Sequence, residues 1–157
     1  MSNPVTNPGN SLSALNPLTQ RDLVPLAVST MGLAIMVGTA IMTLFLLLNR
    51  SMVQDLPMTP DARPDVYQPA ATMLMVGVMS TLIVPMVTAW ALLAPIEVTY
   101  RRFGFSMVSG LGALAVSILA VPANEFLGLQ GLIGLLAISL LACLLLAKRV
   151  LAVRSAL

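Results

Sequence analysis

The residues of this chain that could do chemistry are methionines, two glutamates and one cysteine. Eleven methionines are present, and Met75, Met79 and Met86 are spaced so that they share one face of a helix. Thioether sulfur is a ligand for Cu(I), so a copper path is one interpretation of this face. Because the chain has no histidine and Cys143 is its only cysteine, we favour flexible packing of methionine in an apolar interior. Cys143 itself is expected to be a small buried hydrophobe, with palmitoylation as the alternative.

Glu97 and Glu125 stand at the margins of long uncharged stretches, and neither lies within one. Glu97 precedes Arg101 by four residues, a spacing that predicts an ion pair on the surface of a helix end. A gating or proton-accepting carboxylate is the alternative for Glu97. We expect Glu125 to face water at the turn between two helices, because a charge is costly to bury in lipid.

Most other chemistry is excluded by the residue types. Without histidine, the chain cannot form a histidine-based catalytic triad and cannot ligate haem or a metal ion through imidazole. The sequence has no Gly-x-Ser-x-Gly motif and no phosphate-binding Walker loop. We therefore expect no enzyme and no metal site, and no motif identifies a cofactor. Nucleic acid is not an expected partner, because the chain has neither a basic amphipathic helix nor an array of aromatic residues.

Composition identifies the class of protein that must position these residues. The chain has 157 residues, of which 58% are hydrophobic and 9% are charged, and its mean hydropathy is +0.95. A soluble domain carries about 25% charged residues, so this chain has too few charges to cover a water-exposed surface. Its apolar residues gather in uncharged stretches long enough to cross a bilayer. We expect an all-α integral membrane protein.

Four transmembrane helices are expected, because the charged residues divide the chain into four long uncharged stretches. About 20 residues of helix cross a hydrocarbon core of roughly 30 Å, and each stretch is long enough. The predicted spans are residues 23–49, 70–96, 103–124 and 126–147. Outside them lie a polar N-terminal arm (1–22), an acidic, proline-rich outer connector (50–69), a basic inner loop (97–102) and a basic C-terminal tail (148–157).

Only Glu125 separates the third and fourth stretches, so their separation depends on a break at residues 121–125. A single helix over residues 103–147 would be about 67 Å long, roughly twice the hydrocarbon thickness. Pro122 cannot continue the hydrogen-bond ladder and Asn124 tolerates turn geometry. We therefore predict that the third and fourth helices form a tight hairpin at this point. Three spans is the alternative, if the hairpin only dips into the membrane.

Prolines within the first two spans carry separate predictions. Pro25 and Pro69 are expected in the first turns of the first and second spans, where a missing N–H group needs no partner. Pro85 lies well inside the second span and predicts a kink. Thr81 or Thr88 is expected to satisfy the backbone groups that Pro85 leaves unpaired.

The distribution of Lys and Arg predicts the orientation of the chain. With four spans, six basic residues lie on one side of the membrane and two, Arg50 and Arg63, lie on the other. Cytoplasmic loops carry the excess of positive charge, so both termini are expected to be cytoplasmic. The membrane is expected to be a bacterial inner (cytoplasmic) membrane, and no cleavable signal peptide is apparent. The basic residues expected to attract lipid headgroups are Arg101, Arg102, Lys148 and Arg149.

Small residues at helical spacing predict where helices pack closely. Lipid tails provide no hydrophobic force between helices, so association depends on small side chains that let backbones approach. We expect the third helix to pair with the fourth. The candidate packing residues are Gly32, Gly38, Ser106, Gly110, Ala113, Ser117, Gly128, Gly131 and Gly134.

These features favour a non-catalytic accessory or scaffold subunit that packs through helix–helix contacts into a larger membrane protein complex, such as a secretion, respiratory or photosynthetic assembly. Its partners would be other membrane subunits or copies of itself, together with lipids, and the arm and connector would dock specifically. The alternative is a small transporter or channel, built by oligomerisation of the four-helix unit, with Pro85 as the hinge. A lysis-type pore is a third hypothesis. The transporter would line its pore with hydroxyl side chains: Ser29, Thr39, Ser80, Thr81 and Ser117.

Overall fold

The fold of the chain is entirely helical in the part that the structure describes. This computed structural model describes residues 17–54, 64–96 and 99–155, and no strand occurs among them. The predicted all-α class is confirmed. Most of the N-terminal arm, the centre of the outer connector and Glu97 lie outside the described residues, so the predictions for them stay predictions. The four helices are α1 (Pro17–Gln54), α2 (Pro64–Leu92), α3 (Thr99–Ser117) and α4 (Ala120–Ser155).

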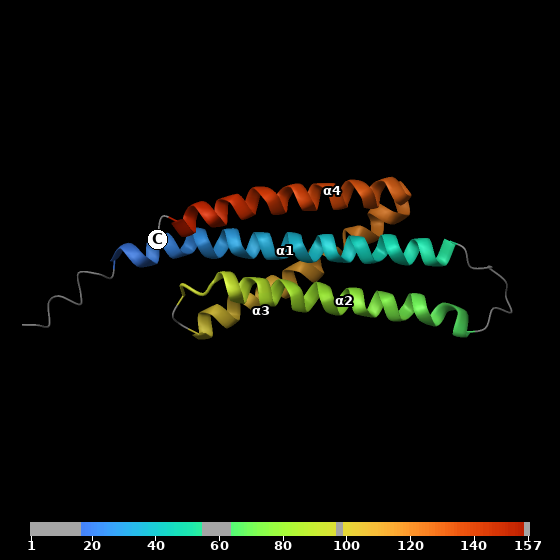
Figure 1. Cartoon of the computed structure of the whole chain (residues 1–157), viewed down its shortest axis with the longest axis horizontal. Coiled ribbons are helices and arrows are strands. Elements are labelled where there is room, and N and C mark those ends of the chain that lie inside the picture. Colours follow the sequence, from blue (N-terminus) through green and yellow to red (C-terminus); the bar gives the residue numbers. More distant parts are fainter. Residues whose placement is uncertain (1–16, 55–63, 97–98, 156–157) are drawn as a thin grey trace, which may run out of the picture.

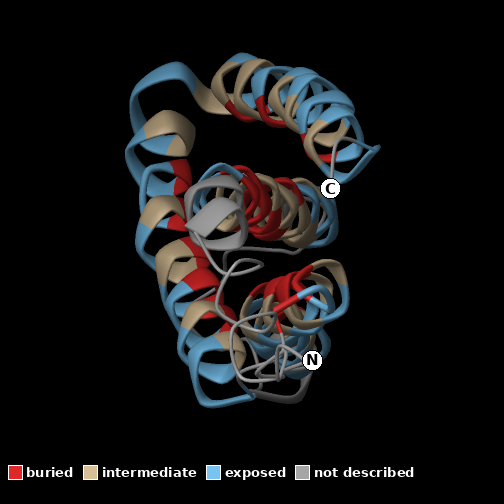
Figure 2. Ribbon diagram, turned by 90° about the vertical axis from the view of Figure 1, so that its left-hand side faces the viewer, coloured by how far each residue is buried: buried red, intermediate tan, exposed pale blue. Residues whose placement is uncertain are grey.

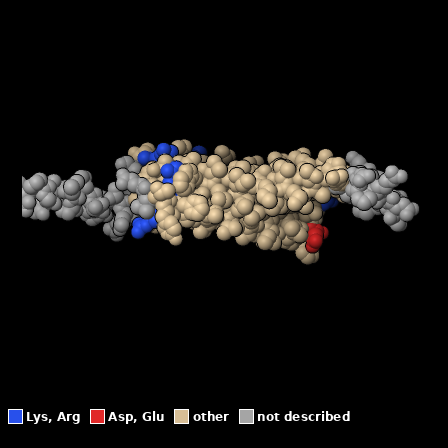
Figure 3. All heavy atoms as spheres, turned by 90° about the horizontal axis from the view of Figure 1, so that it is seen from below, with Lys and Arg blue, Asp and Glu red and all other residues tan. Residues whose placement is uncertain are grey.

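Three helical stretches are long and apolar enough to cross a membrane, namely Leu23–Val53, Gln68–Leu92 and Ala120–Ser155. The third predicted span corresponds to α3, which has 19 residues and begins with the polar sequence Thr-Tyr-Arg-Arg. Basic side chains gather at one end of the molecule and an acidic one lies at the other, with an uncharged band between them (Figure 3). The chain is therefore a membrane-embedded helical protein.

The helices extend beyond the predicted spans. α1 begins at Pro17 and α4 continues to Ser155, so both run into polar sequence that was predicted to be arm and tail. Polar residues can continue a helix where it leaves the apolar layer, since each added residue gains a backbone hydrogen bond. Because α1 begins at Pro17 and the second helix at Pro64, the predictions that Pro25 and Pro69 lie in first turns are both wrong.

α1 is the central helix of the bundle. It packs against α2, α3 and α4, and α2 also packs against α3. Seen along the long axis, the buried residues lie on the faces that the helices turn toward one another (Figure 2). α3 runs diagonally behind α2 and α1, and the described start of α1 lies at the same end as the end of α4 (Figure 1).

The predicted pairing of the third helix with the fourth is wrong. α3 and α4 do not pack along their lengths, because α3 packs against α1 and α2 while α4 packs against α1. The buried residues of α3 are small and turn toward these two helices: Ser106, Ser109, Gly110, Ala113 and Ser117. The small face was predicted from the sequence, but its neighbours are different.

The helix break predicted at residues 121–125 is not found there, because these residues are helical. A turn at residues 118–119 ends α3, and the chain is helical again from Ala120, so Pro122 lies in a first turn where its missing N–H group needs no partner. Pro122 is thus a helix start and not the break that was predicted at residues 121–125. The non-helical residue is Gly128, with φ 59° and ψ −139°. Glycine adopts this positive φ without the steric cost that a Cβ atom brings.

Pro85 lies inside α2, and the helix continues through it. Proline has no N–H group, so the carbonyl of Thr81 loses its helical partner. The Thr81 hydroxyl donates to the carbonyl oxygen of Gly77 at 2.8 Å. The Thr88 hydroxyl donates to the carbonyl oxygen of Val84, also at 2.8 Å. Neither hydroxyl satisfies the freed carbonyl, so that prediction is wrong. The backbone of Gly38 lies against this oxygen instead.

Candidate functional site

Three helices meet at Gly38, near the middle of α1. A Cβ atom built on Gly38 would lie 2.5 Å from the Cβ of Ala113 in α3 and 2.7 Å from the ring of Pro85 in α2. It would also lie 3.1 Å from the carbonyl oxygen of Thr81. No side chain fits at Gly38 without movement of its neighbours. Gly38, Ala113 and Pro85 therefore form one closely packed junction, in which Ala113 and Thr81 are fully buried.

A second close contact joins α3 to α2 through Gly110 and Ser106. A Cβ atom on Gly110 would lie 2.5 Å from the Cγ of Met86 and 2.8 Å from the carbonyl oxygen of Leu82. One helical turn earlier, the hydroxyl of Ser106 donates to the carbonyl oxygen of Met86 at 2.6 Å. Hydrogen bonds between helices and close backbone approach are the two ways in which membrane helices associate. Both occur at this contact.

The remaining predicted packing glycines have different surroundings. Gly32 of α1 faces Leu146 of α4 at an ordinary contact distance of 3.5 Å. Gly131 lies at the hairpin, where an added Cβ would collide with the carbonyl oxygen of Ala123. Gly134 faces open space, with no atom within 4 Å of an added Cβ. Gly134 therefore has no packing role within the described part of this chain.

The buried hydroxyl groups are mostly bonded to the backbone of their own helix. Thr39 donates to Ile35 at 3.0 Å and Ser117 donates to Ala113 at 2.6 Å, each to the carbonyl oxygen four residues earlier. Thr30 is the exception, because its fully buried hydroxyl has no partner among the described residues. Of the predicted pore residues, Ser29 is buried and Ser80 lies on the outer side of α2. The same bonding to the helix backbone occurs at Thr43, Thr81, Ser109 and Ser139.

Polar side chains connect the helices at the hairpin end of the molecule. Nη1 of Arg50 donates to Oδ1 of Asn124 at 2.7 Å, which joins α1 to the start of α4. The guanidinium nitrogens of Arg50 also lie 3.7 and 3.8 Å from the position of a Cβ on Gly128. Nδ2 of Asn49 donates to the carbonyl oxygen of Ala70 at 2.7 Å, which joins α1 to α2. These hydrogen bonds hold the end of α1 between α2 and the hairpin.

Four basic residues were predicted to attract lipid headgroups, and they have two kinds of surroundings. Arg101, Lys148 and Arg149 are exposed. Arg102 is half-buried, its Nε donates to the carbonyl oxygen of Trp90 at 2.7 Å, and its guanidinium carbon lies 4.3 Å from the centroid of the indole ring. A cation over an aromatic face is attracted by the ring quadrupole. Arg102 therefore connects α3 to α2.

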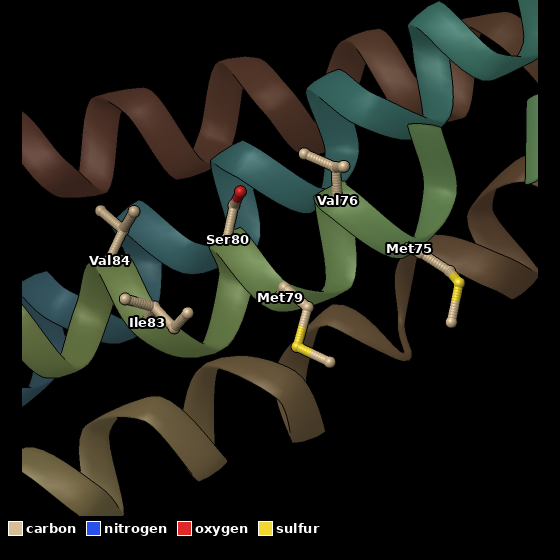
Figure 4. Close-up of a pocket in the computed structure, with 6 residues that line it drawn as sticks. All are labelled: Met75, Val76, Met79, Ser80, Ile83 and Val84. Atoms are coloured by element: carbon tan, nitrogen blue, oxygen red, sulfur yellow. The ribbon is translucent and has the colours of Figure 1, made fainter. Parts of the chain in front are cut away.

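The outer side of α2 carries a shallow groove of about 420 Å³. Its side chains form two rows with a spacing of four residues: Met75, Met79 and Ile83 in one, and Val76, Ser80 and Val84 in the other (Figure 4). Rows of this kind are ridges, and a second helix packs its own ridges into the groove between them. Met75 and Met79 lie in this groove, whereas Met86 packs on Gly110. The described residues contain no group of three or more metal-ligating His, Cys, Asp or Glu side chains.

α4 is covered on one side only. Cys143 is half-buried, and α1 is the helix against which α4 packs along its length. The opposite side of α4 exposes large apolar side chains: Leu129, Ile133, Ile138, Leu140, Leu141, Leu144, Leu145 and Leu151. We refer to this set, together with Gly134, as the outer face of α4.

Sequence reasoning missed the contacts of Arg50, Asn49 and Arg102. Each of these residues stands at the end of an apolar stretch: Asn49 was predicted only as the last residue of the first span, Arg50 only as a charge that sets orientation, and Arg102 as a ligand for lipid headgroups. Polar residues at the ends of two different spans are a usable signal, because spans that end at the same membrane surface bring them close together.

No protein family, curated protein or solved structure that was compared with the chain matches it.

Proposed function

We propose that this chain is a non-catalytic small polytopic subunit that packs through helix–helix contacts into a larger membrane protein complex, in an accessory or scaffold role. Its interior is suited to packing: the buried hydroxyls at positions such as Thr39 and Ser117 donate to their own helix, and Gly38 and Gly110 admit neighbouring helices. The Met-lined surface faces outward and is not the wall of an internal path. We infer no catalytic role for any of these residues.

We propose four membrane crossings with both termini in the cytoplasm of a bacterium. The third crossing would combine α3 with the first turns of α4, up to Gly128, where the backbone leaves the helical conformation. The start of α1 and the end of α4 lie together (Figure 1), which an even number of crossings requires. Arg101, Lys148 and Arg149 lie in the segments nearest that end, and an excess of positive charge favours the cytoplasmic side.

The observation that carries the proposed subunit role is the outer face of α4. Gly134 opens away from the protein, although a small residue inside a membrane helix is useful mainly where another helix approaches. Exposed apolar side chains surround it, among them Ile133, Ile138 and Leu141. An added Cβ at Gly134 would meet no atom within 4 Å among the described residues, so we assign this glycine to a contact with a helix of another subunit.

The test is purification of the tagged full chain from its native membrane in mild detergent, followed by sizing and mass spectrometry. We expect other membrane proteins at a fixed ratio to the chain. Gly134→Leu fills the open position on the outer face of α4 and is expected to reduce the co-purified proteins at least about fivefold, the effect of losing one close helix contact.

Gly104→Leu is the matched control, because Gly104 is also helical and also has no atom within 4 Å of an added Cβ. Both variants change a helical glycine at which an added Cβ has room, and Gly104 lies on α3. Equal loss of partners in both variants would contradict the assignment of the outer face of α4. A homo-oligomer that conducts solutes in liposomes would contradict the subunit role and favour the transporter.

A further inference from the structure

A groove of about 480 Å³ lies at the basic end of the molecule, between α1 and the beginning of α3. Val24 and Val28 of α1 form one apolar wall, and Ile96 and Phe105 contribute the other. Arg101 also lines the groove, and no acidic side chain among the described residues does so. Small-molecule sites have volumes of about 300–1,000 Å³ and combine apolar walls with a few polar groups. The groove has this size and this combination.

The two adjacent arginines at the start of α3 have separate roles. Arg102 is held by the carbonyl oxygen and the ring of Trp90, so its guanidinium is part of the α2–α3 contact. Arg101 is exposed and is one of the residues that line the groove. Arginine binds phosphate through two parallel N–H donors, which gives this position a preference for phosphate-bearing ligands. The cation at the groove is therefore Arg101 and not its neighbour.

We propose that this groove binds one anionic phospholipid, with an acyl chain along the apolar wall and the phosphate at Arg101. The wall is open to the surroundings of a membrane helix, since Val24 and Val28 are 62% and 63% exposed. Charge complementarity selects this occupant, because the end of the molecule that holds the groove is basic (Figure 3) and attracts anionic headgroups. The lipid site is independent of the proposed subunit role.

The test is native mass spectrometry of the full chain in mild detergent, titrated with phosphatidylglycerol or with phosphatidylcholine of the same acyl chains. We expect one phosphatidylglycerol molecule to be retained in preference to phosphatidylcholine. Arg101→Gln is expected to weaken the retention of phosphatidylglycerol about fivefold, to the level of phosphatidylcholine. Val28→Trp fills the groove and is expected to reduce the retention of both lipids.

Two matched variants separate a specific site from general attraction. Arg154→Gln removes an exposed charge from the basic end, and Ile138→Trp adds an indole to an exposed position of α4. Neither residue lines the groove. Both variants should retain lipid as the unmodified chain does. The proposal is overturned if Arg101→Gln keeps the preference for phosphatidylglycerol or if Arg154→Gln loses it equally. It is also overturned if the chain forms a dimer that excludes lipid and that Val28→Trp dissociates.

Discussion

Gly38 and Gly134 differ in what an added methyl group would meet, and this difference separates close packing from intrinsic helix preference. Alanine is favoured over glycine inside a helix by about 0.5–1 kcal/mol, so we expect Gly134→Ala to stabilise the isolated chain by about that amount. At Gly38 the methyl group would collide with Ala113 and Pro85. We expect Gly38→Ala to destabilise the chain by about 1–3 kcal/mol, the usual effect of overpacking. Denaturant titration in mild detergent, followed by circular dichroism, measures both changes, and stabilisation by both substitutions would contradict the packing at Gly38.

The candidate site residues could be predicted from the sequence in their type but not in their contacts. Spacing identified Gly38, Gly110 and Ala113 as small positions, because a helical period places such residues on one face. It could not tell that Gly38 meets two helices whereas Gly134 meets none, since this depends on how the whole bundle is arranged. Arg102 was interpreted as a lipid ligand because the sequence does not show its contact with Trp90, which joins residues on two different helices.

At the scale of the elements, the end of α1 is fastened to the hairpin by the hydrogen bond from Arg50 to Asn124. Hydrogen bonds to charged groups contribute about 1.5–3 kcal/mol, and partial exposure to water places this one near the lower value. We expect a double-mutant cycle of Arg50→Ala and Asn124→Ala to give a coupling free energy of about 1–2 kcal/mol in the unfolding equilibrium. Additive effects of the two substitutions would show that the hydrogen bond from Arg50 to Asn124 does not stabilise the hairpin. The same cycle on Arg50 and Gln130, an exposed residue just beyond Gly128, is the control and should be additive.

Helix existence could be predicted from the sequence more reliably than helix ends and turns. Long uncharged stretches predict the presence of α1, α2 and α4, because a helix satisfies the backbone groups of such a stretch within the stretch itself. The ends were predicted too short, since charged residues such as Lys148 were taken as stop signals although a helix continues through them into water. The turn was placed at Pro122 because proline interrupts a helix interior, but the same residue is favourable in a first turn. The reversal at Gly128 requires a positive φ, and a glycine among several others gives no sign of it in the sequence.

For the whole molecule, the number of crossings can be measured by labelling from either side of the membrane. Ser51 and Ser155 are exposed residues near the ends of α1 and α4. In a Cys143→Ser background, we expect Ser155→Cys to react with an impermeant maleimide only from the cytoplasmic side. Ser51→Cys should react only from the opposite side, because four crossings place the two residues on different surfaces. Reaction of both cysteines from one side would contradict the four crossings and favour three.

The central position of α1 has a consequence for how the molecule is built. α4 emerges from the ribosome after the other three helices, and α1 is the helix on which it packs, with Leu146 against Gly32. During synthesis, the surface of α1 that contacts α4 has no protein neighbour while α2 and α3 are inserted. Bundle closure is therefore a late event in biogenesis, when the last segment docks onto the first. Until then, acyl chains or the insertion machinery must shield the waiting surface.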